Sequence, residues 1–130
     1  MARPVLADAD VLIDYAAGTG AAGQVERLIT AGRLRLPVVA FYELWRGAGS
    51  EEDRAEMRRL LAGIPVVWLT RHDAEAAADV WSDLTEHQRG QVGDRDILIA
   101  GTALSRRWPL LTRNRRHFAL TGADLYRDGE

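Results

Sequence analysis

The sequence predicts an α/β fold in which a parallel central sheet carries helices on both faces. Short apolar runs such as PVVWL and PLLT have the length and composition of buried strands. Helix-forming segments separate these runs, which is the pattern of repeated strand–helix–strand units. The chain has 130 residues, of which 47% are hydrophobic and 28% charged, and it shows no repeat or linker. We therefore expect one domain over residues 1–130.

Five apolar segments are the expected strands. The first is short and lies beside Pro4, and the third, PVVWL, is an unbroken apolar run of the kind that is buried on both faces of a sheet. The last, ADLY, is weak. In chain order, the strands are expected at residues 3–7, 33–36, 65–69, 109–112 and 123–126.

Capping residues and glycines set the expected helix boundaries. Asp10 can cap the first helix, and Pro37 suits the first turn of the third. The sequences SEED at 50–53 and TRHD at 70–73 are typical of capping boxes, and a glycine-bounded turn is expected at 90–93. In chain order, the helices are expected at residues 11–17, 24–31, 37–46, 51–61, 70–88, 94–107 and, as a short helix or turn, 114–118.

The composition excludes several kinds of chemistry. The chain has no cysteine, which excludes disulfides, thiolate catalysis and sulfur-ligated metals. All 17 basic residues are arginine, and without lysine neither P-loop phosphate binding nor Schiff-base chemistry is available. The net charge of −2 produces no overall attraction to nucleic acid. No apolar run is long enough for a membrane span, and no signal peptide is visible, so we expect a cytoplasmic protein.

Three acidic residues lie within or beside the most apolar segments: Asp8, Glu43 and Asp96. Asn114, the only asparagine, follows the apolar run PLLT. A buried carboxylate is costly unless it is paired or binds a metal. Because sites in open α/β sheets form at the carboxyl ends of strands, we expect these four residues to meet at one edge. Such a set of oxygen ligands suits Mg²⁺ or Mn²⁺, which can activate water and polarise a phosphoryl oxygen.

Four sequence blocks carry a resemblance to a known family. LADADVLIDYAAG, AFYELWRG, DILIAGTAL and LLTRNRRHF resemble, in order and spacing, the blocks of PIN-domain ribonucleases, and most closely those of VapC-type toxins of type II toxin–antitoxin systems. The resemblance spans nearly the whole chain. It implies a three-layer PIN-like fold and a Mg²⁺- or Mn²⁺-dependent endoribonuclease, which cleaves RNA and leaves a 5′-phosphate.

The resemblance also implies roles and partners. Asp8 and Asp96 would be the main metal ligands, Glu43 a ligand or water-orienting base, and Asn114 an outer ligand with Thr112 beside it. A cognate VapB-type antitoxin would wrap the toxin and block the metal site. The toxin would form a homodimer, would have no membrane partner, and would reach DNA only through the antitoxin.

Two positions depart from the family pattern. Asp10 stands where many relatives have asparagine, and His117 stands where the final block often has aspartate. Because Asn114 is uncharged, the site is expected to carry three anions, which weakens the case for a tightly held second metal.

Several polar residues have an alternative structural interpretation. Asp10 and Asp94 are interpreted first as helix caps, with a role as secondary metal ligands as the alternative. Asp14 is interpreted as a solvated helix residue. Asn114 could also be a turn former. Three arginines beside Asn114 are candidates for RNA phosphate contacts, with an ordinary solvated turn as the alternative: Arg113, Arg115 and Arg116.

Two other functions remain open. The motif D-A-D at 8–10 also fits a haloacid-dehalogenase-like phosphatase that uses Asp8 as its nucleophile. Such enzymes usually need a lysine, which this chain lacks, and Glu43 would then be unexplained. The second alternative is a non-catalytic PIN-like module that only binds a protein partner. The presence of an acid at all three core positions argues against it.

Overall fold

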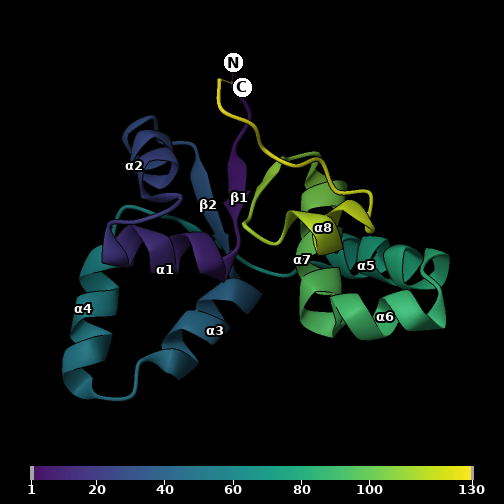
Figure 1. Ribbon diagram of the computed structural model, residues 1–130, viewed down its shortest axis with the longest axis horizontal. Coiled ribbons are helices and arrows are strands. Elements are labelled where there is room, and N and C mark those ends of the chain that lie inside the picture. The colour runs from purple at the N-terminus through teal and green to yellow at the C-terminus, as the bar shows by residue number, and fades with distance from the viewer. Residues whose placement is uncertain (1, 130) are drawn as a thin grey trace.

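Four short parallel strands form the central sheet of the protein. The computed structural model describes residues 2–129 (Figure 1). The strand order is β3-β2-β1-β4, so the N-terminal strand β1 lies in the middle. Val5 pairs with Leu34 on one side of β1, and Leu6 pairs with Leu110 on the other. The strands are β1 Val5–Ala7, β2 Leu34–Pro37, β3 Val66–Val67 and β4 Leu110–Leu111.

Helices cover the sheet and complete the expected three-layer α/β architecture. In Figure 1, α1 to α4 lie on one side of β1, and α5 to α8 lie on the other. All three residues of β1 are fully buried, so the core runs directly through the centre of the sheet. The helices are α1 Ala9–Ala17, α2 Ala22–Thr30, α3 Val38–Gly47, α4 Glu51–Leu61, α5 Arg71–Asp83, α6 Glu86–Val92, α7 Asp94–Arg106 and α8 Arg115–Ala119.

The expected strands at 65–69 and 123–126 differ most from the structure. Within PVVWL only Val66 and Val67 are in strand conformation, and both are half-buried because β3 is an edge strand. Trp68 is 72% exposed, so the prediction of a strand buried on both faces is wrong. The expected strand at 123–126 is reduced to a single bridge between Leu110 and Leu125.

The predicted helix at 70–88 is two helices. The capping box of Thr70 and Asp73 begins α5 as expected, but α5 ends at Asp83. A second capping box, formed by Thr85 and Gln88, begins α6, which continues through the expected turn at 90–93 as far as Val92. A capping box overrides a helical pattern because it satisfies the free N–H groups of a new first turn.

Helix α7 packs closely along α5 at Gly101. A Cβ atom at this position would lie 2.6 Å from both the amide nitrogen of Ala77 and the carbonyl oxygen of Asp73. Main-chain atoms cannot move aside as a flexible side chain can, so the close approach of the two helices requires glycine here. None of the helices within residues 2–129 combines the length and the hydropathy that crossing a bilayer requires.

Candidate functional site

The carboxyl ends of β1 and β4 position the first part of the site. Asp8 directly follows β1, and its amide nitrogen donates to the carbonyl oxygen of Leu111 at 2.9 Å. Its two carboxylate oxygens accept hydrogen bonds from the amide of Ala9 at 2.8 Å and from Thr112 Oγ1 at 2.9 Å. Asp8 is buried and is also the N-cap of α1. One residue therefore ends a strand, begins a helix and places a carboxylate at the sheet edge.

The prediction that Asp10 caps the first helix is wrong. Asp8 occupies the cap position, and α1 begins at Ala9, which places Asp10 in the first turn of the helix. The Asp10 carboxylate accepts a hydrogen bond from the amide of Arg113 at 3.1 Å and lies 3.4 Å from Thr112 Oγ1. Asp10 therefore faces the end of β4 beside Asp8, at the same edge of the sheet.

An arginine links the other two acids of the site. Glu43 comes from the middle of α3, and Asp96 from the first turn of α7. Arg95 Nε lies 2.9 Å from Glu43 Oε1 and 3.8 Å from Asp96 Oδ1. The contact with Glu43 is an ion pair without hydrogen-bond alignment, since Oε1 is buried and has no hydrogen-bond partner.

The four acids raise each other's affinity for a proton. Burial is the largest cause that raises the pKa of Asp8, Asp10, Glu43 and Asp96 above the ordinary value of each carboxyl group. Repulsion adds to it: Asp96 raises the pKa of Asp8, Asp8 raises those of Asp10 and Glu43, and Asp10 raises that of Asp96. Residues from three helices and one strand end thus form one electrostatically coupled group.

Asn114 lies at the border of this group. Its main-chain amide donates to Thr112 Oγ1 at 3.0 Å, and its side-chain nitrogen lies 3.1 Å from His117 Nδ1. His117 in turn is close enough to Asp96 to lower the pKa of that carboxyl group. The sequence did not identify either Arg95 or His117 as a site residue. The only signal for Arg95 was its place between two aspartates in a first helical turn.

The other candidate residues differ in their exposure and in their contacts. Asp94 is exposed and does not cap α7, whose N-cap is Gly93, so the capping prediction is wrong. Arg113 Nη1 pairs at 3.1 Å with Asp14, which is buried instead of solvated. The other two candidates for RNA contacts, Arg115 and Arg116, are both exposed, and Arg115 donates to the carbonyl oxygen of Tyr126 at 3.1 Å.

The donor chemistry of the site fits a hard divalent cation. Carboxylate oxygens from Asp8, Asp10, Glu43 and Asp96 face one edge, and Glu43 Oε1 is buried without a hydrogen bond. Among residues 2–129, however, no three histidine, aspartate or glutamate side chains are spaced to hold one ion together. Arg95, Thr112 and main-chain amides engage their oxygens instead.

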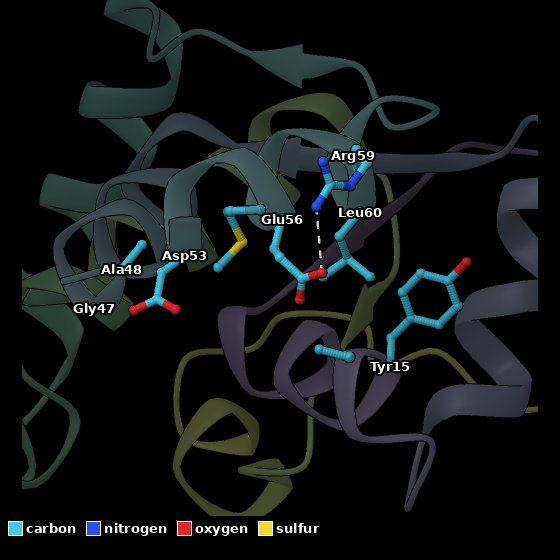
Figure 2. A pocket seen from close by; sticks show the side chains of 9 residues that line it. Tyr15, Gly47, Ala48, Asp53, Glu56, Arg59 and Leu60 are labelled. Carbon is cyan, nitrogen blue, oxygen red and sulfur yellow. Dashed lines mark hydrogen bonds and ion pairs between the residues drawn. The ribbon is translucent and has the colours of Figure 1, made fainter. Parts of the chain in front are cut away.

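A groove lies beside the acids, not over them. Figure 2 shows it between α1 and α4, with Tyr15 on one wall and the ion pair of Arg59 and Glu56 on the other. Its volume is about 580 Å³. A smaller cavity of about 210 Å³ contains Glu43 and shares Gly47 and Met57 with the groove. The groove therefore adjoins the cavity that Glu43 lines.

Comparisons with solved structures agree on the fold. DNA-bound VapBC from Salmonella typhimurium aligns with a TM-score of 0.81 and 22% identity over 96% of this chain and 98% of that chain. FitAcB from Neisseria gonorrhoeae aligns with a TM-score of 0.76 and 17% identity over 95% and 96%. A toxin-antitoxin complex from Klebsiella pneumoniae aligns with a TM-score of 0.68 and 22% identity over 88% and 90%. At these low sequence identities, the TM-scores show similarity of fold alone.

The sequence itself matches one family. No curated protein is similar enough in sequence to count as a relative of this chain. The family model of the PIN domain matches residues 5–123, a span that begins with β1 and ends after α8. It contains all four acids of the site together with Thr112 and Asn114. The chain belongs to the PIN domain family.

Proposed function

We propose that this protein is a metal-dependent endoribonuclease that acts as a VapC-like toxin. The observation that carries the proposal is the coupled group of Asp8, Asp10, Glu43 and Asp96 at one sheet edge, each with a raised pKa. Like charges held this closely are unfavourable unless they serve a ligand of opposite charge. Perturbed acids in a group of this kind are typical of functional sites.

Asp8, Asp96 and Glu43 would hold Mg²⁺ or Mn²⁺, with Asp10 as a further ligand. A divalent cation bound there lowers the pKa of water and neutralises charge that develops on a phosphoryl group. Thr112 orients the Asp8 carboxylate through its hydroxyl group. Glu43, whose raised pKa makes it a stronger base than a solvated glutamate, would accept a proton from the attacking water.

Asn114 and Arg116 would act on the RNA side of the site. Asn114 is held by Thr112 and contacts His117, so it supports the site from outside the ligand set. Arg116 has the bidentate geometry that suits an RNA phosphate and is exposed. Arg113 and Arg115 are already engaged by Asp14 and Tyr126, which makes them weaker candidates.

The proposed partner is a VapB-type antitoxin. Two aligned structures are a VapBC bound to DNA and a toxin-antitoxin complex, which supports a partner of this class. The groove in Figure 2 is the place we propose for an antitoxin segment, because it shares Gly47 and Met57 with the cavity that contains Glu43. The toxin would work in the cytoplasm, as a homodimer, and contact DNA only through the antitoxin.

The rival function is a PIN-fold module that binds a partner without catalysis. The observation in its favour is that no three acid or histidine side chains within residues 2–129 are spaced to hold an ion. Against it stand the four coupled acids, which a binding module does not need. The phosphatase alternative gains no support, because the chain has no lysine to stabilise a phosphoaspartate on Asp8.

RNA cleavage by purified protein tests the proposal. The 5′ ends of a mixed RNA substrate are mapped with Mn²⁺ or Mg²⁺, with chelator, and with the variants Asp8→Asn and Asp96→Asn. Loss of a ligand should cost at least ~100-fold in rate, more than the loss of an outer-shell contact. Asp83→Asn, an exposed acid at the end of α5, is the matched control and should cleave normally. Wild-type rates in the Asp8 and Asp96 variants, or indifference to chelator, would favour the binding module.

A further inference from the structure

Arg95 is the one cation that contacts the acids of the site through its side chain in the described part of the chain. It lies in the first turn of α7, and its guanidinium reaches across to α3, 2.9 Å from Glu43 Oε1 and 3.8 Å from Asp96 Oδ1. Arg113 contributes its main-chain amide to Asp10, while its guanidinium pairs with Asp14 outside the site. Arg95 therefore supplies the positive charge in direct contact with the ligands, whereas Arg46 and His117 act on Glu43 and Asp96 only from a longer distance.

The electrostatic effect of Arg95 extends beyond its direct contacts. Its charge lowers the pKa values of Asp8, Glu43 and Asp96, the three acids that we assign as ligands, and it opposes the increase caused by burial. A divalent cation bound to these carboxylates would have the same effect, with a larger charge. Arg95 and such a cation thus compete for the same negative charge.

The contact of Arg95 with Glu43 can be exchanged at low cost. The Arg95 side chain is 48% exposed, and Glu43 Oε1 receives no aligned hydrogen bond from it. An ion pair with one partially solvated member is weaker than a fully buried pair, so a divalent cation with a larger charge can replace it. A long arginine side chain at a helix start can also turn towards solvent without changing the backbone. The fixed contacts of the site, such as Thr112 with Asp8, do not involve Arg95.

We propose that Arg95 is an internal counter-ion, which holds Glu43 and Asp96 in the metal-free protein and is displaced from them when a divalent cation binds. The inference rests on the proposed function of the site as a metal centre. It gives a reason why no three acids among residues 2–129 are spaced to hold an ion in this conformation: Arg95 pairs with two of the ligands. Arg95 is in this sense a positioning residue that sets the metal affinity.

Thermodynamic linkage relates the Arg95 contacts to the affinity of the site for a divalent cation. If Arg95 and the cation exclude each other from the same carboxylates, removal of the guanidinium must increase the affinity for the cation. Arg95→Gln keeps much of the length of the side chain and removes its charge. A coupling of ordinary size predicts that Arg95→Gln binds Mn²⁺ about 5- to 100-fold more tightly than the wild type. Arg95→Lys keeps the charge and should stay close to the wild-type affinity.

The experiment measures Mn²⁺ binding by calorimetry and by electron paramagnetic resonance, with Mn²⁺ itself as the probe. The matched control is Arg71→Gln, which removes the same charge from an 88% exposed side chain at the start of α5. It should bind Mn²⁺ as the wild type does. Thermal unfolding is recorded in chelator and in saturating Mn²⁺. Arg95→Gln should lower the melting temperature in chelator, because its acids are left unneutralised, and should show a larger increase with Mn²⁺ than the wild type.

The outcomes separate this inference from the proposed function. Equal or weaker Mn²⁺ binding by Arg95→Gln, in a wild type that binds Mn²⁺ and cleaves RNA, would overturn the counter-ion role and leave the nuclease intact. An equal loss of melting temperature with and without Mn²⁺ would also overturn it, because that is the result of a purely structural arginine. Failure of both the wild type and Arg95→Gln to bind Mn²⁺ would refute the metal centre itself.

Discussion

Two buried acidic sites, Asp73 and the acids at the sheet edge, differ in how their charge is satisfied. Asp73, in the first turn of α5 and in contact with α7, is 1% exposed. It accepts hydrogen bonds from the amide of Thr70 at 2.9 Å, from Arg106 Nη2 at 2.9 Å and from Ser105 Oγ. Burial by itself raises the pKa of Asp73, but these donors together bring it below its ordinary value.

The acids at the sheet edge show the opposite balance. Burial again raises the pKa of Asp8 and Asp96, but here the neighbours include further acids, and the result stays above the ordinary value. At Asp73 a single acid meets several donors; at the edge, several acids repel one another, and among the described residues only Arg95 forms an ion pair with any of them. Burial alone therefore does not identify a functional acid. A functional acid is identified by too few hydrogen-bond donors and cations for the acids present, because the remaining negative charge favours the binding of a cation.

The largest contrast is expected from matched Asp→Asn changes in the two groups. Asp73→Asn leaves Arg106 without its anionic partner in a mostly buried place and should cost about 3 kcal/mol of unfolding free energy. Asp8→Asn removes one of the repelling charges and should leave the stability of the metal-free protein unchanged or increased. Urea unfolding in chelator at pH 7 measures both. A loss of similar size for Asp8→Asn would remove the distinction between the groups.

The packing beneath Asp73 is the next test. Gly101→Ala places a methyl group 2.6 Å from the main chain of α5 and should cost about 1–3 kcal/mol. Gly90→Ala is the control, since Gly90 lies in α6 and an added Cβ meets nothing within 4 Å. It should stabilise α6 by about 0.5–1 kcal/mol. RNA cleavage per folded molecule should not change in either variant. If Gly101→Ala is as stable as the wild type, the contact between α5 and α7 is looser than described.

The smallest expected effect is a difference in pH dependence. The raised pKa of Asp8 means that the folded state keeps a proton that the unfolded state has lost. Above pH 3.8 its contribution to the unfolding free energy therefore decreases as the pH rises through the folded-state pKa. The lowered pKa of Asp73 stabilises the fold above pH 3.8, and this stabilisation is lost as the pH falls through the folded-state value.

Melting temperatures between pH 3 and pH 7, measured in chelator, compare the two groups. Asp8→Asn should gain on the wild type as the pH rises above 3.8. The deficit of Asp73→Asn relative to the wild type should be full above pH 3.8 and should shrink as the pH falls below 3.8. Saturating Mn²⁺ should abolish the first trend, because the bound ion keeps Asp8 ionised. Parallel curves for the wild type and both variants would show that the two groups do not differ in this respect.

Local sequence patterns predicted most of the architecture. Apolar runs at the right spacing predicted the parallel sheet, and the patterns at Ser50 and Thr70 predicted the starts of α4 and α5. Patterns were less successful where the tertiary position decides the outcome. PVVWL reads as a fully buried strand, but it lies at the sheet edge, where Trp68 is exposed. The local sequence pattern does not predict the order of the strands in the sheet, so it cannot distinguish a central strand from an edge strand.

The sequence by itself determined which acidic residues lie in apolar segments: Asp8, Glu43 and Asp96. Such residues stand out because burying a charge is costly in any fold. Only the tertiary structure decided what meets them there. It brought Asp10 and Arg95 to the same edge and sent Asp94 to the surface. The physical reason is that burial depends on residue type and local pattern, whereas electrostatic coupling depends on distances between elements that are far apart in the chain.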